Sequence, residues 1–550
     1  MFTVSPISKI IALFIVLLAG LSLLEYQSLI FFGIMQGKCD QGEYLKAIVY
    51  LIAYCISILG ILSIMLCSNR SIRVVGSLFI GLLICVNLSS IAILGQNVGL
   101  GDVSAAVSLP SFAATYIQSH LHSIIKASAL AFGLVGAFYL LASRLRARLH
   151  PVFLLSVPIG LLSVFIIIWV TMAVLDHFPS PMRIPMLVAY NSMSRTYAGP
   201  REEVTLKVDR KGKPRHIIFI VDESVRGDLL TINGNAMDTT PFLMGKQSSI
   251  LNLGIASSAT NISSGSNIVL MSGLRVDQCP DIDQLALKCP TIFQYAKNAG
   301  YQTYFLDAQT APGAYANFMR ADDFKVIDHA VYSMSMPDLP IYERDGVLAT
   351  ELIRILNSAV PSFVYVNKYG AHADWRDSYP PGKSQFTPII SDGGSIGSSS
   401  KEAAMNTYAN AVSWSVDAFF QQIWPHINSD EVVLIYTSDH GQSIKEGKFP
   451  STHGDRVDPP ESQANVPLFI IGKRAQALFP DDSAFAKNNS THFQIFPSLL
   501  ILMGYDSDAV IEEYDKPLWE EWTAPRVFQS GDIFSRGIPY INSFLIEPVR

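Results

Sequence analysis

The chain has 550 residues, of which 49% are hydrophobic and only 16% are charged, and its net charge is −6. Soluble proteins carry about 25% charged residues, so this composition indicates that part of the chain lies in a lipid bilayer and argues against a wholly soluble enzyme. Residues 1–177 carry a net charge of +4 and residues 178–550 a net charge of −10. The acidic second part argues against a nucleic-acid-binding protein, which needs a basic surface.

Five apolar stretches each approach the roughly 20 residues that a helix needs to cross a bilayer. The first is too long for the core of a signal peptide, and no small-residue cleavage site follows it, so we interpret it as a retained anchor. The sequence therefore predicts a five-helix transmembrane domain over residues 1–177. The predicted spans are Ile10–Ile30, Ala47–Cys67, Val74–Gly95, Ser123–Ser143 and Val152–Leu175.

Basic residues between the spans indicate the orientation of this domain. Lys and Arg concentrate in the cytoplasmic loops of membrane proteins. Six basic residues fall on the side of the N-terminus, and three fall on the opposite side. We therefore expect a cytoplasmic N-terminus and an exported C-terminal part, which lies in the periplasm of a Gram-negative cell. The six are Lys9, Arg70, Arg73, Arg144, Arg146 and Arg148, and the three are Lys38, Lys46 and Lys126.

Two features near the outer ends of the spans each have two interpretations. Glu25 lies inside the first span or near its outer end, and acids within a membrane are candidates for function. The alternative is that Glu25 is solvated at the level of the headgroups. Residues 178–210 form a connector containing Pro, Met and Arg. This connector is either an amphipathic segment on the outer leaflet or an ordinary linker.

Residues 211–550 alternate between short apolar runs and helical patterns. Runs of this kind, continuous rather than alternating with polar residues, predict a mostly parallel sheet with helices on both faces. The Gly- and Ser-rich segment Ser391–Ser400 predicts a mobile loop. The predicted strands are His216–Val221, Gln302–Leu306, Phe363–Val366, Val432–Tyr436 and Pro467–Ile471, and two predicted helices are Thr291–Ala299 and Glu402–Trp424.

Polar clusters follow three of these strands. Glu223 follows the first strand, His372 the third, and the pair Asp439-His440 the fourth. Ligands bind at the carboxyl ends of parallel strands, where such clusters meet. Taken singly, each cluster is also explained by helix capping, by a helix-dipole contact or by a solvated histidine. Together, and with His453 a short distance further on, they favour a metal site.

The ligand types narrow the choice of metal. Carboxylate and imidazole without thiolate suit Zn²⁺, Mn²⁺ or a similar divalent ion. A bound ion lowers the pKa of a hydroxyl group and makes it a nucleophile. The segment Ser257–Ser266 is rich in hydroxyl groups and precedes the helical run Asn267–Ser272, so it is a candidate source of that nucleophile. The alternative is a Ser-rich capping loop.

Cysteine is sparse in the exported part, which contains only Cys279 and Cys289. In an oxidising compartment these two residues are close enough in sequence to form one disulfide across a short loop. Two free thiols are the alternative.

In this order, the clusters resemble the alkaline phosphatase/sulfatase superfamily and, within it, the membrane-anchored phosphoethanolamine transferases. The family layout consists of five transmembrane helices, a connector and a periplasmic sulfatase-like α/β domain, here residues 1–177, 178–210 and 211–550. Residues 223–228 are similar to E-T-x-R-x-D, 438–441 to S-D-H-G, 453–454 to H-G, 370–372 to G-S-H, 406–417 to N-x-Y-x-N…D, and 491–498 to S-H-F-x-x-F-P-T.

The resemblance implies roles for individual residues. Glu223, Asp439 and His440 hold one or two divalent ions, Zn²⁺ or Mn²⁺, and His372 and His453 face the substrate phosphate or a second ion. Ser263 takes the position of the family's nucleophilic threonine, with Ser264 and Thr260 as alternatives. Arg226 either binds phosphate or forms a salt bridge with Asp228 or another acid.

The resemblance also implies a reaction. Phosphoethanolamine passes from phosphatidylethanolamine, through a covalent Ser263 intermediate, to an envelope glycan or lipid A-type acceptor at the bacterial inner membrane. Ala373-Asp374 replaces the family's Gly-Pro after His372, so the acceptor stays open. The alternatives are phosphoglycerol transfer, hydrolysis of sulfate or phosphate esters at the same site, and a catalytically silent envelope scaffold.

Overall fold

A computed structural model of the chain forms two compact units, built mainly from residues 1–195 and residues 196–536. The structure describes residues 6–25, 27–40, 42–94, 97–99, 103, 121–171, 178–193, 196–209, 212–336, 338–392, 394, 396–446, 452–454, 459–481, 484–531, 533–534 and 541–546.

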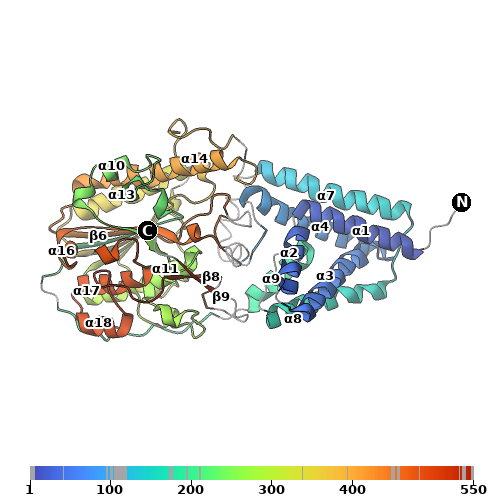
Figure 1. Cartoon of the computed structure of the whole chain (residues 1–550), viewed down its shortest axis with the longest axis horizontal. Coiled ribbons are helices and arrows are strands. Elements are labelled where there is room, and N and C mark those ends of the chain that lie inside the picture. The colour runs from blue at the N-terminus through green and yellow to red at the C-terminus, as the bar shows by residue number, and fades with distance from the viewer. Residues whose placement is uncertain are drawn as a thin grey trace. The chain divides into compact units, whose positions relative to one another are not determined.

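The first unit is helical (Figure 1). Within its described residues, three helices are long and apolar enough to cross a membrane: Tyr44–Met65, Arg70–Ile93 and Leu121–Arg144. They correspond to the second, third and fourth predicted spans. The helices of this unit are α1 (Pro6–Glu25), α2 (Gln27–Asp40), α3 (Tyr44–Met65), α4 (Arg70–Leu94), α7 (Leu121–Arg144), α8 (Ser156–Thr171) and α9 (Ser180–Met193), with a 3-10 turn at Pro151–Leu155.

The first and fifth predicted spans coincide with shorter apolar helices. Within the predicted span Ile10–Ile30, the structure describes α1 as far as Glu25 and α2 from Gln27, and residue 26 lies outside the described part of the chain. The fifth span is helical as far as Thr171, and its last residues lie outside the described part of the chain. The structure therefore supports a unit of apolar helices, while the count of five spans remains a prediction.

Glu25 is fully buried, which corrects the interpretation of a solvated headgroup residue. Its carboxylate accepts hydrogen bonds from the backbone N–H of Ser180, at 3.3 Å, and from the Ser180 hydroxyl. Arg183, one turn along α9, is also fully buried and donates to Asn87. A buried carboxylate needs such partners because desolvation of a charge is costly. The segment Ser180–Met193 is thus a packed helix of the first unit rather than an irregular linker.

The second unit contains a seven-stranded sheet in its described residues, in the order β2-β7-β6-β1-β5-β3-β4. Strands β6, β1, β5, β3 and β4 are parallel, and β7 is antiparallel to both of its neighbours. The prediction of a mostly parallel sheet is therefore confirmed. The strands are β1 (His216–Asp222), β2 (Leu251–Ser257), β3 (Gln302–Asp307), β4 (His329–Tyr332), β5 (Ser362–Asn367), β6 (Val432–Ser438) and β7 (Asn465–Ile471), with a separate hairpin of β8 (Val527–Gly531) and β9 (Ile541–Leu545).

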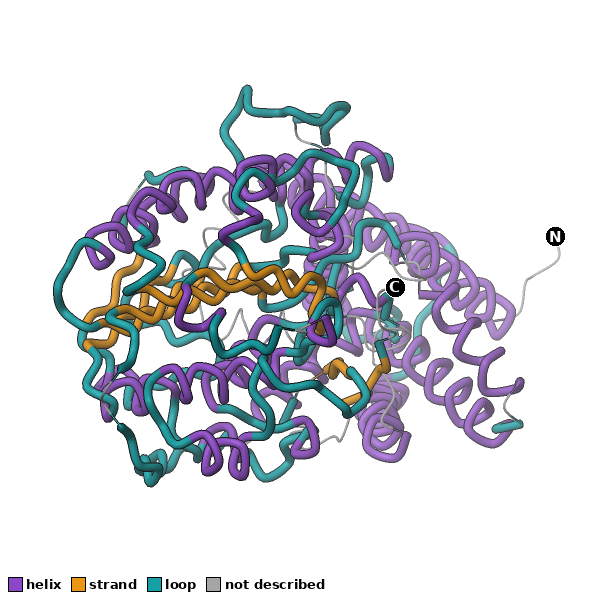
Figure 2. The backbone as a smooth tube through the Cα atoms, turned by 60° about the vertical axis from the view of Figure 1, so that its left-hand side comes forward, coloured by secondary structure: helices purple, strands orange, loops and turns teal. Residues whose placement is uncertain are grey.

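Helices cover both faces of this sheet, as Figure 2 shows. Successive residues of β1 point into different cores, with Ile218 in one and Phe219 in the other. Burial of each such side chain contributes about 1.5–3 kcal/mol, which explains why the strands are apolar throughout. Figure 1 shows α10 (Pro241–Met244), α13 (Arg344–Leu356) and α14 (Lys401–Val412) on one side of β6, and α11 (Ser263–Ser272), α17 (Ile495–Leu502) and α18 (Ser507–Tyr514) on the other.

Two helix predictions are confirmed with refinements. The predicted helix Thr291–Ala299 is α12 (Ile292–Asn298), which Thr291 caps. The predicted helix Glu402–Trp424 is α14, followed by a π-helix at Ser413–Ala418 and by α15 (Phe419–Ile423). The segment Ser391–Ser400 contains no helix or strand among its described residues, as expected of a loop.

Cys279 and Cys289 are both free thiols, so the disulfide alternative is wrong for this structure. The Cys279 thiol donates to the carbonyl of Arg275, at 3.6 Å. The loop between the two cysteines is held instead by Asp281, whose carboxylate accepts from the backbone N–H groups of Leu285 and Ala286. Burial raises the pKa of the Cys289 thiol to about 11, which keeps it protonated near neutral pH.

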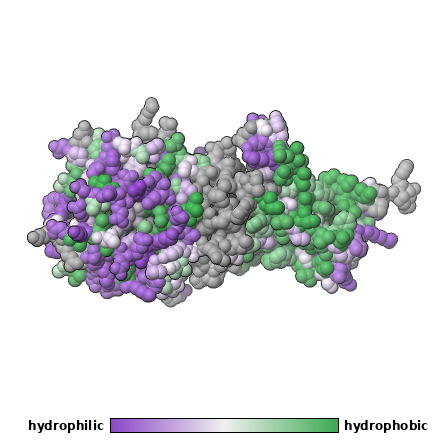
Figure 3. All heavy atoms as spheres, turned by 90° about the horizontal axis from the view of Figure 1, so that it is seen from below, coloured by the Kyte–Doolittle hydropathy of each residue, from purple (hydrophilic) through white to green (hydrophobic). Residues whose placement is uncertain are grey.

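The surfaces of the two units differ in character. Figure 3 shows a mainly hydrophobic surface on the helical first unit and a mainly hydrophilic face on the second. On α3, Leu45 and Ile48 are among the exposed large hydrophobic residues. Contiguous apolar surface of this kind indicates a lipid environment for the first unit.

Candidate metal centre

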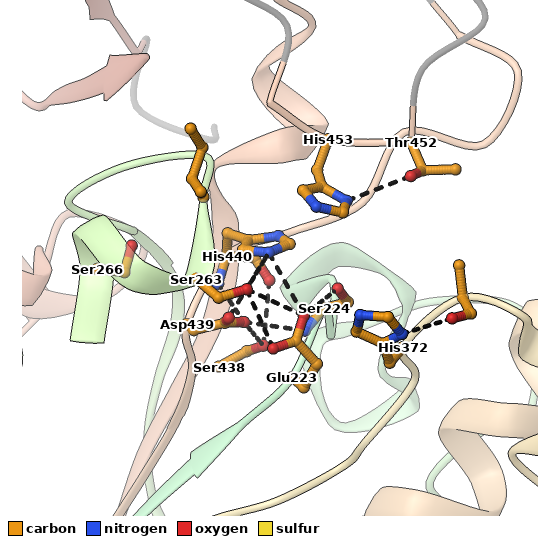
Figure 4. A network of polar contacts seen from close by, with 12 residues as sticks. Glu223, Ser224, Ser263, Ser266, His372, Ser438, Asp439, His440, Thr452 and His453 are labelled. Atoms are coloured by element: carbon orange, nitrogen blue, oxygen red, sulfur yellow. Dashed lines mark hydrogen bonds and ion pairs between the residues drawn. The ribbon is translucent and has the colours of Figure 1, made fainter. Parts of the chain in front are cut away.

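The predicted metal ligands lie side by side because β1 and β6 are neighbouring parallel strands. Asp222 pairs with Ser438 in the register of these strands, so the residues that follow, Glu223 and Asp439, leave the sheet together. Ser263, the first residue of α11, brings its hydroxyl group to the same point. Figure 4 shows these side chains converging.

Glu223, Asp439 and His440 are all buried, and each offers one ligand atom such that these atoms lie within 4.8 Å of one another. His440 Nε2 lies 3.5 Å from Glu223 Oε1 and 3.6 Å from Asp439 Oδ2. The Ser263 Oγ lies 3.1 Å from Glu223 Oε2 and 3.2 Å from His440 Nε2. The four side chains therefore surround one small volume with two carboxylates, an imidazole and a hydroxyl.

The two buried carboxylates of this cluster suit a cation. Burial raises the pKa of Glu223, and burial followed by the charge of Glu223 raises the pKa of Asp439 to about 7. Within the described part of the chain, no N–H or O–H group donates to Asp439 Oδ2, which is buried. A buried, unsatisfied carboxylate oxygen beside a second carboxylate fits a divalent ion better than it fits a protein hydrogen-bond network.

The orientation of His440 also suits a ligand. Its Nδ1 lies 2.6 Å from the carbonyl of Gly441, which can only accept, so Nδ1 carries the proton. Nε2 is therefore the ring nitrogen that faces Ser263 and the carboxylates. Histidine ligands of metals are commonly fixed by such a contact to a backbone carbonyl.

His372 and His453 both lie beside this cluster. The ring of His453 stacks on that of His440, with 4.5 Å between ring centroids, and its Nδ1 is 3.2 Å from the Thr452 hydroxyl. His372 contacts the carbonyl of Ala373 through Nδ1. Burial lowers the pKa of both histidines, which favours their neutral forms. The structure thus offers neutral imidazoles at the edge of the site.

Arg226 is engaged by two carboxylates. Its guanidinium lies 2.5 Å from Asp228 and 3.0 Å from Glu446, and Nε, Nη1 and Nη2 all donate to these two residues. This is the salt-bridge alternative left open by the sequence.

The three candidate nucleophiles differ in their surroundings. The Thr260 hydroxyl is buried and donates to the carbonyl of Ile262 at 2.6 Å, so it closes the turn before α11. Ser264 is the second residue of α11. Of these three hydroxyl groups, the Ser263 hydroxyl is the one that contacts Glu223 and His440 in the described part of the chain.

Sequence reasoning missed Gln309, which lies two residues beyond β3. Its Nε2 donates to Glu223 Oε2 at 3.2 Å and to the carbonyl of Lys368 at 2.7 Å. The signal was present, because Gln309 is one more polar residue after the end of a strand. The strand end alone does not show which of Asp307, Gln309 and Thr310 turns toward the site.

The matched segment 406–417 contributes side chains that hydrogen-bond to the backbone near the site and at the start of α10. The Tyr408 hydroxyl donates to the carbonyl of Ser224 at 2.6 Å and accepts from the N–H of Arg226 at 2.9 Å. It therefore fixes the turn that follows Glu223. The Asp417 carboxylate accepts from the backbone N–H groups of Phe242 and Leu243, at the start of α10.

Residues 215–505, more than half of the chain, match the sulfatase family, and the chain belongs to this family. A curated relative is the Kdo(2)-lipid A phosphoethanolamine 7''-transferase of Escherichia coli K12, which is 24% identical over 331 residues. That alignment covers 58% of this chain and 56% of the relative, so the chain spans little more than half of the relative's length. The resemblance to phosphoethanolamine transferases is confirmed.

Two solved structures share the fold. The integral membrane lipooligosaccharide phosphoethanolamine transferase A of Neisseria meningitidis aligns with a TM-score of 0.64 at 17% identity and covers 92% of this chain and 98% of its own. The periplasmic domain of EptC from Escherichia coli, in complex with Zn, aligns with a TM-score of 0.51 at 18% identity and covers 64% of this chain and 96% of its own. The first alignment extends the shared fold to the helical unit.

Proposed function

We propose that the protein transfers phosphoethanolamine from phosphatidylethanolamine to an envelope glycan or lipid A-type acceptor. The observation that carries this proposal is the contact of the Ser263 hydroxyl with Glu223 and His440 in a buried set of metal-ligand atoms. The relatives named as phosphoethanolamine transferases support the choice of transferred group.

Glu223, Asp439 and His440 are the residues that would hold a divalent ion, together with the oxygen of Ser263. When bound, such an ion lowers the pKa of a hydroxyl group and neutralises charge on phosphoryl oxygens. The Zn complex of the EptC domain supports zinc as the ion. The number of ions, one or two, belongs to this proposal.

Ser263 acts as the nucleophile in the first half of the reaction. Its oxygen forms a bond to the phosphorus of the donor, the bond from phosphorus to the diacylglycerol oxygen breaks, and diacylglycerol leaves with a proton. Ser263 begins a ten-residue helix, and the free N–H groups of a helix N-terminus favour negative charge on the phosphoryl group.

His372 and His453 serve the two proton transfers. A neutral imidazole beside the site can accept the proton of the attacking hydroxyl group and return it to the leaving oxygen. In the second half, an acceptor oxygen attacks the same phosphorus and releases Ser263, which regains its proton. Two successive displacements predict ping-pong kinetics.

The apolar helices of the first unit support a membrane location for this chemistry. We propose a multi-pass protein of the bacterial inner membrane, with a cytoplasmic N-terminus and the sulfatase domain in the periplasm. A donor with two acyl chains stays in the bilayer, so the catalytic domain must be tethered to the same surface. The distribution of Lys and Arg between the predicted spans supports the orientation.

Intact-mass spectrometry of the detergent-solubilised full chain tests the proposal. After incubation with phosphatidylethanolamine, we expect an added mass of about 123 Da, as phosphoethanolamine esterification requires. The adduct should disappear in Ser263→Ala and persist in Ser264→Ala, the matched control. An adduct formed only with phosphatidylglycerol would indicate phosphoglycerol transfer, and no adduct with metal bound would indicate hydrolysis or a scaffold.

A further inference from the structure

A fully buried lysine lies behind the metal centre. Lys368 follows β5 directly, and its side chain and that of Asp222 are both 0% exposed. The ammonium group lies 2.5 Å from Asp222 Oδ2, 3.6 Å from Asp345 Oδ2 and 4.4 Å from the centre of the Phe419 ring. Lys368, Asp222 and Asp345 thus form a buried charged cluster, the node. The ammonium group needs these partners because burial of an unpaired charge would be too costly.

The helix packed against this node offers a backbone carbonyl to the ammonium group of Lys368. Lys368 also donates to the carbonyl of Ser415, which lies in the π-helix Ser413–Ala418 between α14 and α15. A regular α-helix engages each carbonyl with the N–H four residues on, whereas a π-helix alters that pattern and is often found at functional sites. The local departure from α-helical geometry therefore coincides with the lysine.

Each carboxylate of the node accepts hydrogen bonds from backbone N–H groups of one segment of the metal centre. Asp222 Oδ1 accepts the backbone N–H of Glu223 at 3.1 Å, and Asp222 Oδ2 accepts the hydroxyl of Tyr436 at 2.9 Å. Asp345 accepts the N–H groups of Tyr369, at 2.7 Å, and Gly370, at 3.2 Å. The first carboxylate thus fixes a predicted metal ligand, and the second fixes the turn that precedes His372.

These two segments, Asp222-Glu223 and the turn before His372, also pack directly on each other. Gly370 has φ +59°, and a Cβ atom there would lie 2.3 Å from Asp222 Oδ1 and 2.6 Å from the carbonyl of Glu223. That carbonyl accepts the N–H of Ala371 at 3.0 Å. The turn before His372 is therefore seated on the Asp222-Glu223 segment, with no room for a side chain between them.

We infer that Lys368 is a positioning residue whose ammonium group, by pairing with Asp222 and Asp345, keeps Glu223 and the turn before His372 in the geometry that binds metal and substrate. The inference rests on the proposed function, since it concerns the same site. It assigns the buried charge a role beyond fold stability. Removal of a residue that supports a metal ligand typically lowers metal affinity by about 10- to 100-fold.

The test compares two buried ion pairs of the same domain in the full chain in detergent. Lys368→Met removes the node, and Arg201→Met removes the pair of Arg201 with Asp323, whose side chains are 6% and 1% exposed. Among the described residues, the other partners of the Arg201 side chain are the carbonyls of Ala286 and Cys289, which belong to no segment carrying the site. Zinc affinity is measured by chelator competition, and the unfolding temperature by fluorescence.

We expect both variants to unfold at lower temperature and only Lys368→Met to bind zinc more weakly, by roughly 10- to 100-fold. Zinc binding by Lys368→Met equal to that of the wild type, or an equal loss in Arg201→Met, would overturn the inference alone. Failure of the wild-type chain to bind zinc would overturn the proposed metal site and this inference with it.

A double variant covers the case in which Lys368→Met does not fold. Asp222→Asn with Lys368→Met removes the opposite charges together and leaves an Asn oxygen that can accept the N–H of Glu223. We expect this double variant to fold. We also expect its zinc affinity to exceed that of any soluble Lys368→Met protein that is recovered. A folded double variant with zinc affinity reduced 100-fold would contradict charge balance as the means of positioning.

Discussion

The Ser263 Oγ lies 3.2 Å from His440 Nε2, although 177 residues separate the two in sequence. Because His440 Nδ1 donates to the carbonyl of Gly441, Nε2 is the ring nitrogen that faces the hydroxyl group. The serine is thus held at the ligand atoms of the cluster rather than merely near them. This relationship distinguishes Ser263 from the other hydroxyl groups of the segment.

Glu223→Gln should reduce zinc affinity by more than the roughly 10- to 100-fold expected for a supporting residue, because it removes a ligand charge. The amide has nearly the same size, so the fold should persist. Elemental analysis and chelator competition measure the effect. Glu431→Gln, which alters a partly exposed carboxylate of the same domain, is the control. Unchanged zinc in Glu223→Gln would remove Glu223 from the ligand set.

Removal of metal by a chelator should abolish transfer and lower the unfolding temperature. Glu223 and Asp439 then face each other without a cation, and loss of a ligand that binds only the folded state destabilises that state. Addition of zinc should restore both properties. Full activity after exhaustive chelation would contradict the metal dependence of the reaction.

Arg226→Met distinguishes the two roles considered for this arginine. If Arg226 only pairs with Asp228 and Glu446, the variant should lose about 1.5–3 kcal/mol of stability, with little change in KM for the lipid donor. Steady-state kinetics below the unfolding temperature measure this. A large rise in KM with stability retained would instead support phosphate binding by Arg226.

His492 should make the sulfatase domain sensitive to acid. Its Nδ1 accepts the N–H of Ala259 at 3.2 Å, and burial lowers its pKa to about 3. Histidine in the unfolded chain has a pKa of about 6.5, so between these values the unfolded state binds a proton that the folded state does not. The free energy of unfolding should therefore fall by up to roughly 1.4 kcal/mol per pH unit as the pH drops from about 6.5 toward 3.

The measurement is the unfolding temperature against pH for the wild type and for His492→Asn. Asparagine offers an acceptor for the N–H of Ala259 but does not titrate, so its profile should be flatter below about pH 6.5. Identical slopes for the two proteins would show that His492 does not carry the acid sensitivity.

Glu25→Ala should destabilise the helical unit without changing zinc affinity. The substitution removes the acceptor of both Ser180 hydrogen bonds and the opposite charge near the buried Arg183. Breaking such a buried arrangement costs about 3–5 kcal/mol. Glu43→Ala, at an exposed ion pair with Lys46 in the same unit, is the control. Equal thermal stability of the two variants in detergent would contradict a structural role for Glu25.

Much of the fold could be predicted because local pattern and burial agree. The runs at β1, β5 and β6 are continuous and apolar, as strands buried on both faces must be. Strand β2 was missed because Asn252 and Gly254 interrupt its pattern at a bulge. Strand β4 was missed because it is four residues long and partly exposed.

The contacts of individual side chains were less predictable. The sequence left open whether Glu25 is buried within the first span or solvated at the headgroups, because its partner Ser180 is 155 residues away. Cys279 and Cys289 looked like a pair by spacing, but Asp281 organises the loop between them. Spacing along the chain does not specify how a loop turns.

The sequence by itself determined the type of sheet and the edge of that sheet at which the polar side chains gather. Apolar runs dictate a parallel sheet, and the ends of its strands bring Glu223, Asp439 and His440 to one edge whatever the loops do. Only the tertiary structure decided that Ser263 rather than Thr260 contacts these side chains, that Arg226 is paired with two carboxylates, and that Lys368 is buried beside Asp222. The physical reason is that the direction of a side chain depends on packing between segments far apart in sequence, which no local pattern encodes.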